Sequence, residues 1–206
     1  MTDARNEIAA PLGSATNGRL EFVHGAADVA IRSDAGMEDL YRARFEGSAP
    51  EVEVHGGTVT VRYPRRFGLS GLRRQSGEVT LNGSIPWRIA VGGGLSELDA
   101  DLGGIRLDSF EVGGGVSRVE LTLDEPSGTV PVRIDGGASN VTIRRPDGVA
   151  ASVLVAGGTS KLTLDDQHLG GVGGKTRLES SGYAGATDRY EISITSGASG
   201  VTVVTR

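Results

Sequence analysis

The sequence predicts an all-β fold, a single parallel β-solenoid of about seven coils of roughly 21 residues each, with no substantial helix. Three observations support this prediction. Glycine accounts for 33 of 206 residues without the Gly-x-y period of collagen, and aromatic residues make up only 4%. Apolar and polar residues alternate on both sides of recurring glycines, which is the period of a strand. The same pattern then returns at a nearly fixed spacing along the chain.

Each copy of the repeat is centred on a glycine. Taking that glycine as origin, apolar residues stand at positions −5, −3, +4 and +6, and serine stands at +2 in most copies. In the Gly94 copy these are Ile89, Val91, Leu98 and Ala100, with Ser96. The predicted corner glycines are Gly25, Gly57, Gly94, Gly115, Gly137, Gly158 and Gly197.

A copy with this spacing is expected to form a strand, a glycine corner and a second strand, because glycine tolerates positive φ and close backbone approach. One copy cannot bury its own apolar side, so the copies must stack. A small residue in the serine position is then expected where a bulky side chain would not pack against the corner. Longer intervals hold extra strand-like pieces at Leu40–Phe45, Glu78–Leu81 and Arg177–Ser180, interpreted as degenerate coils or projecting hairpins.

The repeat pattern begins near residue 18, so residues 18–206 are expected to form one repeat domain after a flexible segment, residues 1–17. The net charge of −5 and the pI near 5.3 disfavour a specific nucleic-acid partner. Cysteine is absent, which excludes disulfides and thiolate metal sites. No signal peptide or transmembrane segment is visible, so a cytoplasmic location is expected, with peripheral membrane association as an alternative.

The segment from position 62 to position 74 is the best candidate contact site. It carries five arginines and no acidic residue, and it also contains Phe67, Leu69 and Leu72. Such a segment could bind an anionic lipid surface, a phosphate or an acidic partner. The alternative is a solvated loop between coils. The candidate binding residues are Arg62, Arg65, Arg66, Arg73 and Arg74.

No catalytic, metal or cofactor site is predicted. The three histidines (His24, His55 and His168) lack the spacing of a metal motif, and the repeat serines lack a histidine in regular relation. A carbohydrate-active β-helix enzyme would need acids gathered in a groove. The acids that such an enzyme could use are Asp99, Asp101, Asp165 and Asp166.

Residues 43–63, followed by the Gly-Gly-x-Ser-x-Leu/Val coils, resemble the bacterial toast-rack or "putative-adhesin" domains of unknown function. The resemblance extends from about Gly18 to Arg206. It implies a β-solenoid without a known catalytic site, of a kind often attached to membrane-associated proteins, and it supplies no site residues to transfer.

The leading functional hypothesis is therefore a non-enzymatic scaffold or interaction module that associates with itself or with the cell envelope. The stretch Val201–Arg206 motivates self-association, because it ends in mid-strand without a polar cap. Binding of an anionic ligand or membrane surface through the arginine segment is the first alternative. A carbohydrate-active enzyme is the second.

Overall fold

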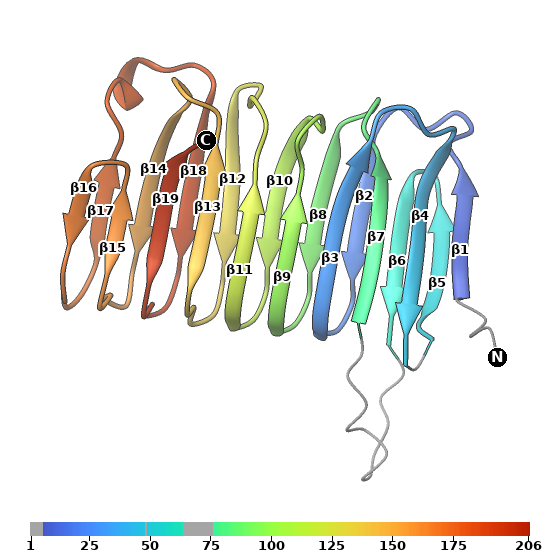
Figure 1. The fold of residues 1–206 in the computed structure, drawn as a ribbon, viewed down its shortest axis with the longest axis horizontal. Helices are drawn as coiled ribbons and strands as arrows, with labels where there is room; N and C mark the ends of the chain where they lie inside the picture. The colour runs from blue at the N-terminus through green and yellow to red at the C-terminus, as the bar shows by residue number, and fades with distance from the viewer. Residues whose placement is uncertain (1–5, 48, 64–75) are drawn as a thin grey trace, which may run out of the picture.

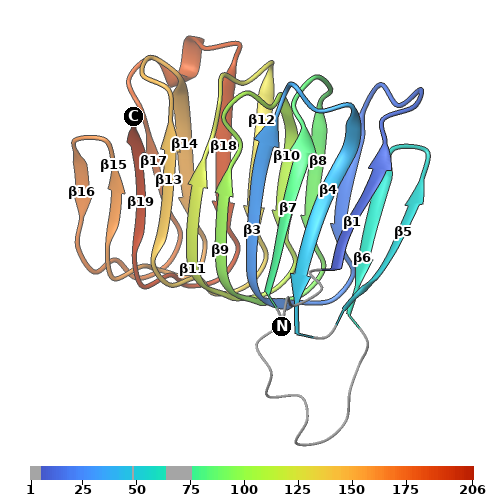
Figure 2. The same ribbon diagram turned by 45° about the vertical axis from the view of Figure 1, so that its right-hand side comes forward.

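The protein forms two β-sheets that face each other along their whole length (Figures 1 and 2). A computed structural model describes residues 6–47, 49–63 and 76–206. The 10-stranded sheet, sheet A, has the order β1 (Asn6–Pro11), β4 (Asp39–Glu46), β7 (Ser76–Asn82), β3 (Ala26–Asp34), β9 (Leu95–Asp101), β11 (Val116–Thr122), β13 (Val141–Arg145), β19 (Val201–Thr205), β15 (Leu162–Leu164) and β16 (Gln167–Leu169).

The 9-stranded sheet, sheet B, has the order β17 (Thr176–Glu179), β14 (Ala150–Val155), β18 (Arg189–Ile194), β12 (Thr129–Ile134), β10 (Leu107–Val112), β8 (Trp87–Val91), β2 (Gly18–Phe22), β6 (Thr58–Arg62) and β5 (Glu51–His55). Among the described residues, helix is limited to the short 3-10 turn η2 (Tyr183–Gly185). The all-β prediction is confirmed.

Both sheets are mixed, which corrects the prediction of a single parallel stack. Neighbouring strands from β7 to β15 in sheet A and from β6 to β14 in sheet B pair in parallel. The outermost pairs are antiparallel: β1–β4, β4–β7 and β15–β16 in sheet A, and β5–β6 and β14–β17 in sheet B. Two of these pairs, β5–β6 and β15–β16, are short hairpins, which require antiparallel strands.

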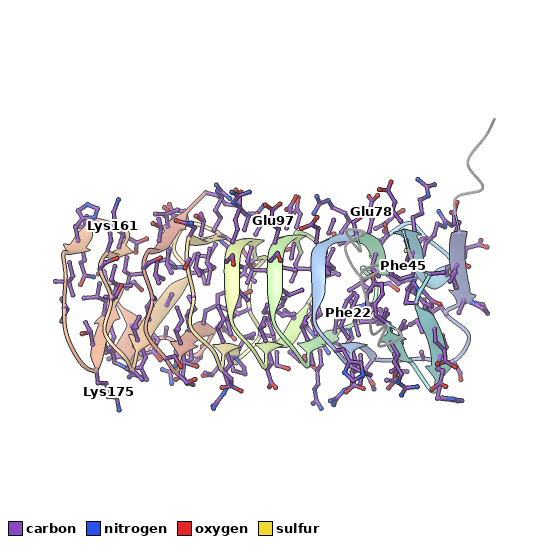
Figure 3. The ribbon with its side chains drawn as sticks, turned by 90° about the horizontal axis from the view of Figure 1, so that it is seen from below. Phe22, Phe45, Glu78, Glu97, Lys161 and Lys175 are labelled. Carbon is purple, nitrogen blue, oxygen red and sulfur yellow. The ribbon has the colours of Figure 1, made fainter. Side chains whose placement is uncertain are left out.

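The core lies between the sheets, where residues at equal offsets from their glycines stand side by side. Phe110 pairs with Ile89 on one side and Val132 on the other, and all three are buried. Phe22 and Phe45 lie between the sheets, whereas charged residues such as Glu97 point outward (Figure 3). Each fully buried apolar side chain contributes about 1.5–3 kcal/mol, so the stacked columns are the main source of stability.

The spatial order of the coils differs from their order in the sequence. The coil β18–β19 lies between the coil β12–β13 and the coil β14–β15, although it follows both in the chain. Val201 in β19 pairs with Val141 on one side and with Leu162 on the other. The strand that was expected to end the stack is therefore an interior strand, and it offers no open edge for self-association.

The β1–β5 end contains two further departures from the repeat. Gly57, which we expected at a corner, instead lies in the turn of the β5–β6 hairpin with φ of +88°. Both strands of that hairpin belong to sheet B, so this copy does not cross to the other sheet. The segment that was expected to precede the repeat domain contains β1, which pairs with β4.

Asn82 is a buried polar residue that joins three segments near the β1–β5 end. Its side-chain amide donates to the carbonyl oxygens of Met37 (2.9 Å) and Asp39 (2.8 Å), and its Oδ1 accepts from the backbone N–H of Ser84 (2.9 Å). The indole N–H of Trp87 donates to the backbone carbonyl oxygen of Asn82 at 2.8 Å. Every polar group of this buried side chain is therefore satisfied.

Asn82→Ala is expected to lower the free energy of unfolding by about 2–3 kcal/mol, because it leaves two part-buried backbone carbonyls and one backbone N–H without their partner. Asn17→Ala, at an exposed position, is the control and is expected to change it by less than about 0.5 kcal/mol. Urea unfolding followed by the fluorescence of Trp87 would measure both. Equal losses in the two variants would contradict this role for Asn82.

Candidate interaction surfaces

The corner glycines bring the backbones of successive coils into close contact. Six of the seven predicted glycines connect a strand of sheet B to a strand of sheet A, namely Gly25, Gly94, Gly115, Gly137, Gly158 and Gly197. A Cβ atom on Gly25 would lie 2.2 Å from the carbonyl oxygen of Gly94, and one on Gly136 would lie 2.3 Å from the backbone nitrogen of Gly115. No side chain fits at these two positions without movement of the backbone.

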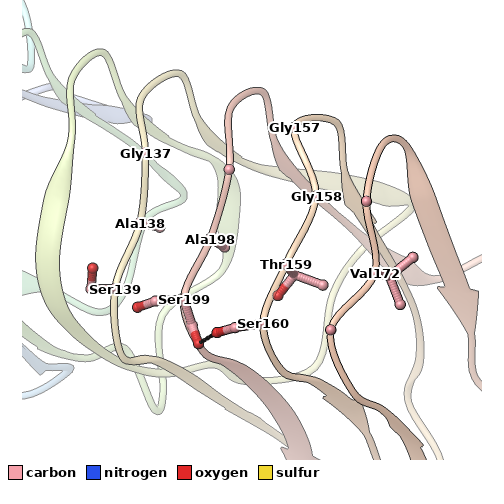
Figure 4. A pocket seen from close by; sticks show the side chains of 13 residues that line it. Gly137, Ala138, Ser139, Gly157, Gly158, Thr159, Ser160, Val172, Ala198 and Ser199 are labelled. Atoms are coloured by element: carbon pink, nitrogen blue, oxygen red, sulfur yellow. Dashed lines mark hydrogen bonds between the residues drawn. The ribbon is translucent and has the colours of Figure 1, made fainter.

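The serine that follows each corner points to solvent. Ser96, Ser117, Ser199 and Ser160 are exposed, so limited packing space does not explain their small size. The residue before each serine is the one that faces the core, as Ala138 and Ala198 do. The serines instead form a column along one edge of the stack, where the hydroxyl of Ser160 donates to the carbonyl oxygen of Ser199 (Figure 4).

This edge holds an open, shallow groove of about 690 Å³ near β15 and β19. Its described lining consists of glycine, alanine, serine, threonine and valine, without a titratable side chain (Figure 4). Such a lining offers hydroxyl groups and backbone, but no acid, base or nucleophile–base pair for catalysis.

Arg62 is the one member of the predicted arginine site within the described part of the chain. It ends β6, and its guanidinium lies 3.9 Å from a carboxylate oxygen of Glu51 and 3.8 Å from one of Glu53. Arg65, Arg66, Arg73 and Arg74 lie outside the described residues. The anionic-ligand site therefore remains a prediction.

The four acids required by the enzyme hypothesis are not brought together. Asp99 and Asp101 lie in β9, whereas Asp165 and Asp166 follow β15, with β11, β13 and β19 between them. Four strand spacings separate the two pairs by about 19 Å. Asp99 also pairs with Arg32 at 2.6 Å, and this hydrogen bond raises the pKa of the arginine. Within the described residues, no cluster of three or more His, Asp or Glu could hold a metal ion.

Arg145 and Asp165 form an ion pair that the sequence analysis missed. Arg145 is only 1% exposed, and its terminal nitrogens lie 3.1 and 2.5 Å from the carboxylate oxygens of Asp165. The pair spans the end of β19, because Arg145 ends β13 and Asp165 follows β15. Arg145 stands at the same distance after its corner glycine as Leu102 and Leu123 do in the two preceding copies. A charged residue at this otherwise apolar position was the sequence signal for a buried ion pair.

The β1–β5 end of the stack is stepped, because sheet A is one strand longer there. Beyond the coil β2–β3, sheet A continues with β7, β4 and β1, while sheet B continues only with β6 and β5. The inward-facing residues Ile8 and Ala10 of β1 and Val52 and Val54 of β5 are only partly buried. One strand further in, Val59 and its neighbours are fully covered. The step thus leaves apolar side chains partly exposed beside two strand edges that have no partner among the described residues.

The opposite end is level and a hydrogen bond links its two sheets, while Leu169 of β16 and Leu178 of β17 are likewise only partly buried there. Both sheets continue by two strands beyond the coil β18–β19, and the side-chain amide of Gln167 in β16 donates to the carbonyl oxygen of Glu179 in β17 at 2.8 Å. The turn η2 folds over the outer face of sheet B. Its Tyr183 donates a hydrogen bond to Glu191 (2.8 Å) and lies under the guanidinium of Arg189, 4.9 Å from the ring centroid.

Tyr63, next to the arginine segment, is buried with its ring edge against Phe45, the ring centroids being 6.3 Å apart. Burial raises its pKa to about 12, and its hydroxyl has no hydrogen-bond partner among the described residues. Because the unfolded phenol has a pKa near 10, the folded protein favours the neutral form. This contribution to stability is complete below about pH 10 and is lost as the pH rises towards 12.

Tyr63→Phe is therefore expected to raise the free energy of unfolding by about 1 kcal/mol at pH 7 and to reduce its loss between pH 10 and 12 by about 2 kcal/mol. Tyr190→Phe is the matched comparison, because its hydroxyl donates to the carbonyl oxygen of Asp124 at 2.8 Å. That variant should lose about 1 kcal/mol at pH 7. Denaturant unfolding at a series of pH values tests both, and a loss at pH 7 in Tyr63→Phe would contradict the unpaired hydroxyl.

Two mixed sheets joined by glycine corners, with their apolar residues stacked in columns, define an all-β repeat domain. A family model described as "N-terminal domain of toast_rack, DUF2154" matches residues 2–144, and the chain belongs to this family. The resemblance seen in the sequence is thereby confirmed.

Two solved structures were also compared with this chain. A structure described as a "putative cell adhesion protein" from Clostridium sporogenes superposes with a TM-score of 0.72 at 20% identity, covering 98% of this chain and 99% of that one. A "putative adhesin" from Bacteroides fragilis gives a TM-score of 0.36 at 7% identity, with 99% and 97% covered. No curated protein matches this chain. In the described part of the chain, no helix has the length and apolar character needed to cross a membrane.

Proposed function

We propose that this protein is a non-enzymatic structural and interaction module, a β-scaffold that associates with itself through its stepped end. The observation that carries the proposal is the step at the β1–β5 end, where the inward-facing apolar residues of β1 and β5 are only partly buried, in contrast to the level β16–β17 end. An inward-facing charge is one of the devices by which edge strands avoid association. The inward positions of β5 hold Val52 and Val54 instead. The similarity to the "putative cell adhesion protein" from Clostridium sporogenes supports a surface or envelope role.

Size-exclusion chromatography with light scattering over a wide concentration range tests this proposal. The unmodified protein is expected to associate as its concentration rises. Val54→Lys places a charge on the inward face of β5 and is expected to abolish association. Leu178→Lys makes the same type of change at the partly buried inward position of β17, at the other end, and is expected to leave association intact. A monomer at every concentration would refute self-association.

A second candidate function is attachment to an anionic surface through the arginine segment. It is favoured by five arginines without an acid between positions 62 and 74 of a chain whose net charge is −5. Co-sedimentation with vesicles that contain phosphatidylserine is expected to retain the protein at low salt. Replacement of Arg65, Arg66, Arg73 and Arg74 by alanine should abolish that retention. Unchanged binding by this variant would reject the segment as the site.

A further inference from the structure

We propose that the stepped end is self-complementary, so that two copies join there about a two-fold axis with β1 of each beside β5 of the other. This inference rests on the proposed function and specifies its partner and its geometry. It predicts a closed pair of molecules rather than an open fibre, because a two-fold contact uses the same surface on both copies and is then complete.

The difference in strand number selects this arrangement. If sheet A of one copy meets sheet B of the other, each joined sheet takes the 10 strands of one and the 9 strands of the other. The overhanging β1 of each copy then fills the missing-strand position beside β5 of its partner. The step disappears on both sides at once.

Head-to-tail stacking does not achieve this fit. The β16–β17 end is level, since both sheets continue by two strands beyond the coil β18–β19. When β1 meets β16 of the next copy, a gap about one strand spacing wide, ~4.8 Å, remains beside β5. Val52 and Val54, which are only partly buried in one molecule, would gain no further burial in such a stack.

Strand directions agree with the two-fold join. Interior strands of sheet A, including β7, run away from the glycine corners. Strand β4 is antiparallel to β7, and β1 is antiparallel to β4, so β1 runs in the same direction as the interior strands. Interior strands of sheet B run towards the corners, and β5 opposes them through its single antiparallel pairing with β6. Both edge strands therefore run away from the corners. A two-fold axis parallel to the strands brings β1 and β5 together as a parallel pair.

Engineered cysteines test the join without interference, because the natural chain contains none. The double variant A9C/H55C places one thiol on the outer face of β1 and one on the outer face of β5, where both residues are exposed. Within one molecule these faces lie on opposite sides of the stack, so only a second copy can bridge them. A9C/E53C covers the neighbouring register. A9C/H168C, with its second thiol on the exposed face of β16 at the far end of the same sheet, is the control, because head-to-tail stacking would place β1 beside β16.

Mild oxidation is expected to convert most of A9C/H55C or of A9C/E53C into a covalent dimer that resists further growth. A9C/H168C is expected to stay uncrosslinked. A ladder of oligomers from A9C/H168C would overturn the two-fold join in favour of head-to-tail stacking, as would association of the unmodified protein without crosslinking of either β1–β5 variant. Both results would leave self-association standing. A protein that light scattering shows to be monomeric would overturn the proposed function as well.

Discussion

A chain that lacks residues 189–206 is expected not to fold into the stack. These residues form β18 and β19, and their removal takes an interior strand from each sheet. The remaining neighbours, β13 and β15 in sheet A and β12 and β14 in sheet B, would then be separated by about 9.6 Å, two strand spacings. The buried residues lost are Tyr190, Ile192, Ile194, Val201 and Val203. At about 1.5–3 kcal/mol each they represent about 8–15 kcal/mol, which is the whole stability of a typical domain.

Circular dichroism and the thermal transition reported by Trp87 would measure this effect. Removal of residues 1–11 is the control, because it takes only the edge strand β1, whose apolar residues are partly buried. That control is expected to lose about 1–3 kcal/mol and to keep a cooperative transition. A synthetic peptide spanning residues 187–206 should restore the transition of the longer truncation. Cooperative unfolding of that truncated chain within a few degrees of the intact protein would refute the structural role of the inserted coil.

Gly136→Ala is a single substitution with a large expected effect. The added methyl group would meet the backbone nitrogen of Gly115 at 2.3 Å and the carbonyl carbon of Gly114 at 2.4 Å. Both atoms belong to the backbone of the adjoining coil and cannot rotate away as a flexible side chain could. Relief requires the coils to separate at the corner, so we expect a loss of at least about 3 kcal/mol in the free energy of unfolding.

Gly173→Ala is the matched control. A Cβ atom at Gly173 meets nothing within 4 Å, and the backbone there does not have positive φ. This substitution is expected to stabilise the protein by about 0.4–1 kcal/mol, because alanine restricts the unfolded chain. Opposite signs in the two variants, measured by urea unfolding, would establish that close approach at the corners requires glycine. Similar small effects in both would contradict it.

The repeat pattern predicted which residues face the core and which residues share a column. Ile89, Phe110 and Val132 share an offset and lie side by side in sheet B. The order of the coils could not be predicted in this way, because every copy presents the same apolar columns to its neighbours. Val141 fits Leu162 as well as it fits Val201. What distinguishes the true neighbour is the path of residues 165–188, in which the regular offsets are interrupted.

Gly57 shows how the same spacing can encode a different structure. Val52, Val54 and Val61 satisfy the repeat, yet the chain reverses within one sheet. Gly56 and Gly57 both have positive φ, as a two-residue hairpin turn of the I′ kind requires. The Gly-Gly dipeptide between two short alternating runs, together with Val59 in place of serine, was the sequence signal for a hairpin.

The stepped end could not be read from the repeat. It depends on the number of strands that each sheet gains outside the regular coils. Strands β1 and β4 lie outside the repeat copies, and β5 lies in the Gly57 copy, which matches the repeat but forms a hairpin. Residues Val52 and Val54 were identified as apolar and inward-facing. Their partial exposure arises because the described part of sheet B ends at β5, while sheet A continues by one more strand, β1. That difference in strand number is a property of the completed sheets.

The insertion of β18–β19 also bears on how the protein is made. A ribosome delivers the chain in sequence order, and domains commonly begin to fold as they emerge. Here β14, β15, β16 and β17 are synthesised before the coil that must lie between them and β12–β13. For that interval the nascent stack has an unfilled place in its middle. Chaperones that cover exposed strand edges are therefore expected to act on this protein late in its synthesis, when most of its coils already exist.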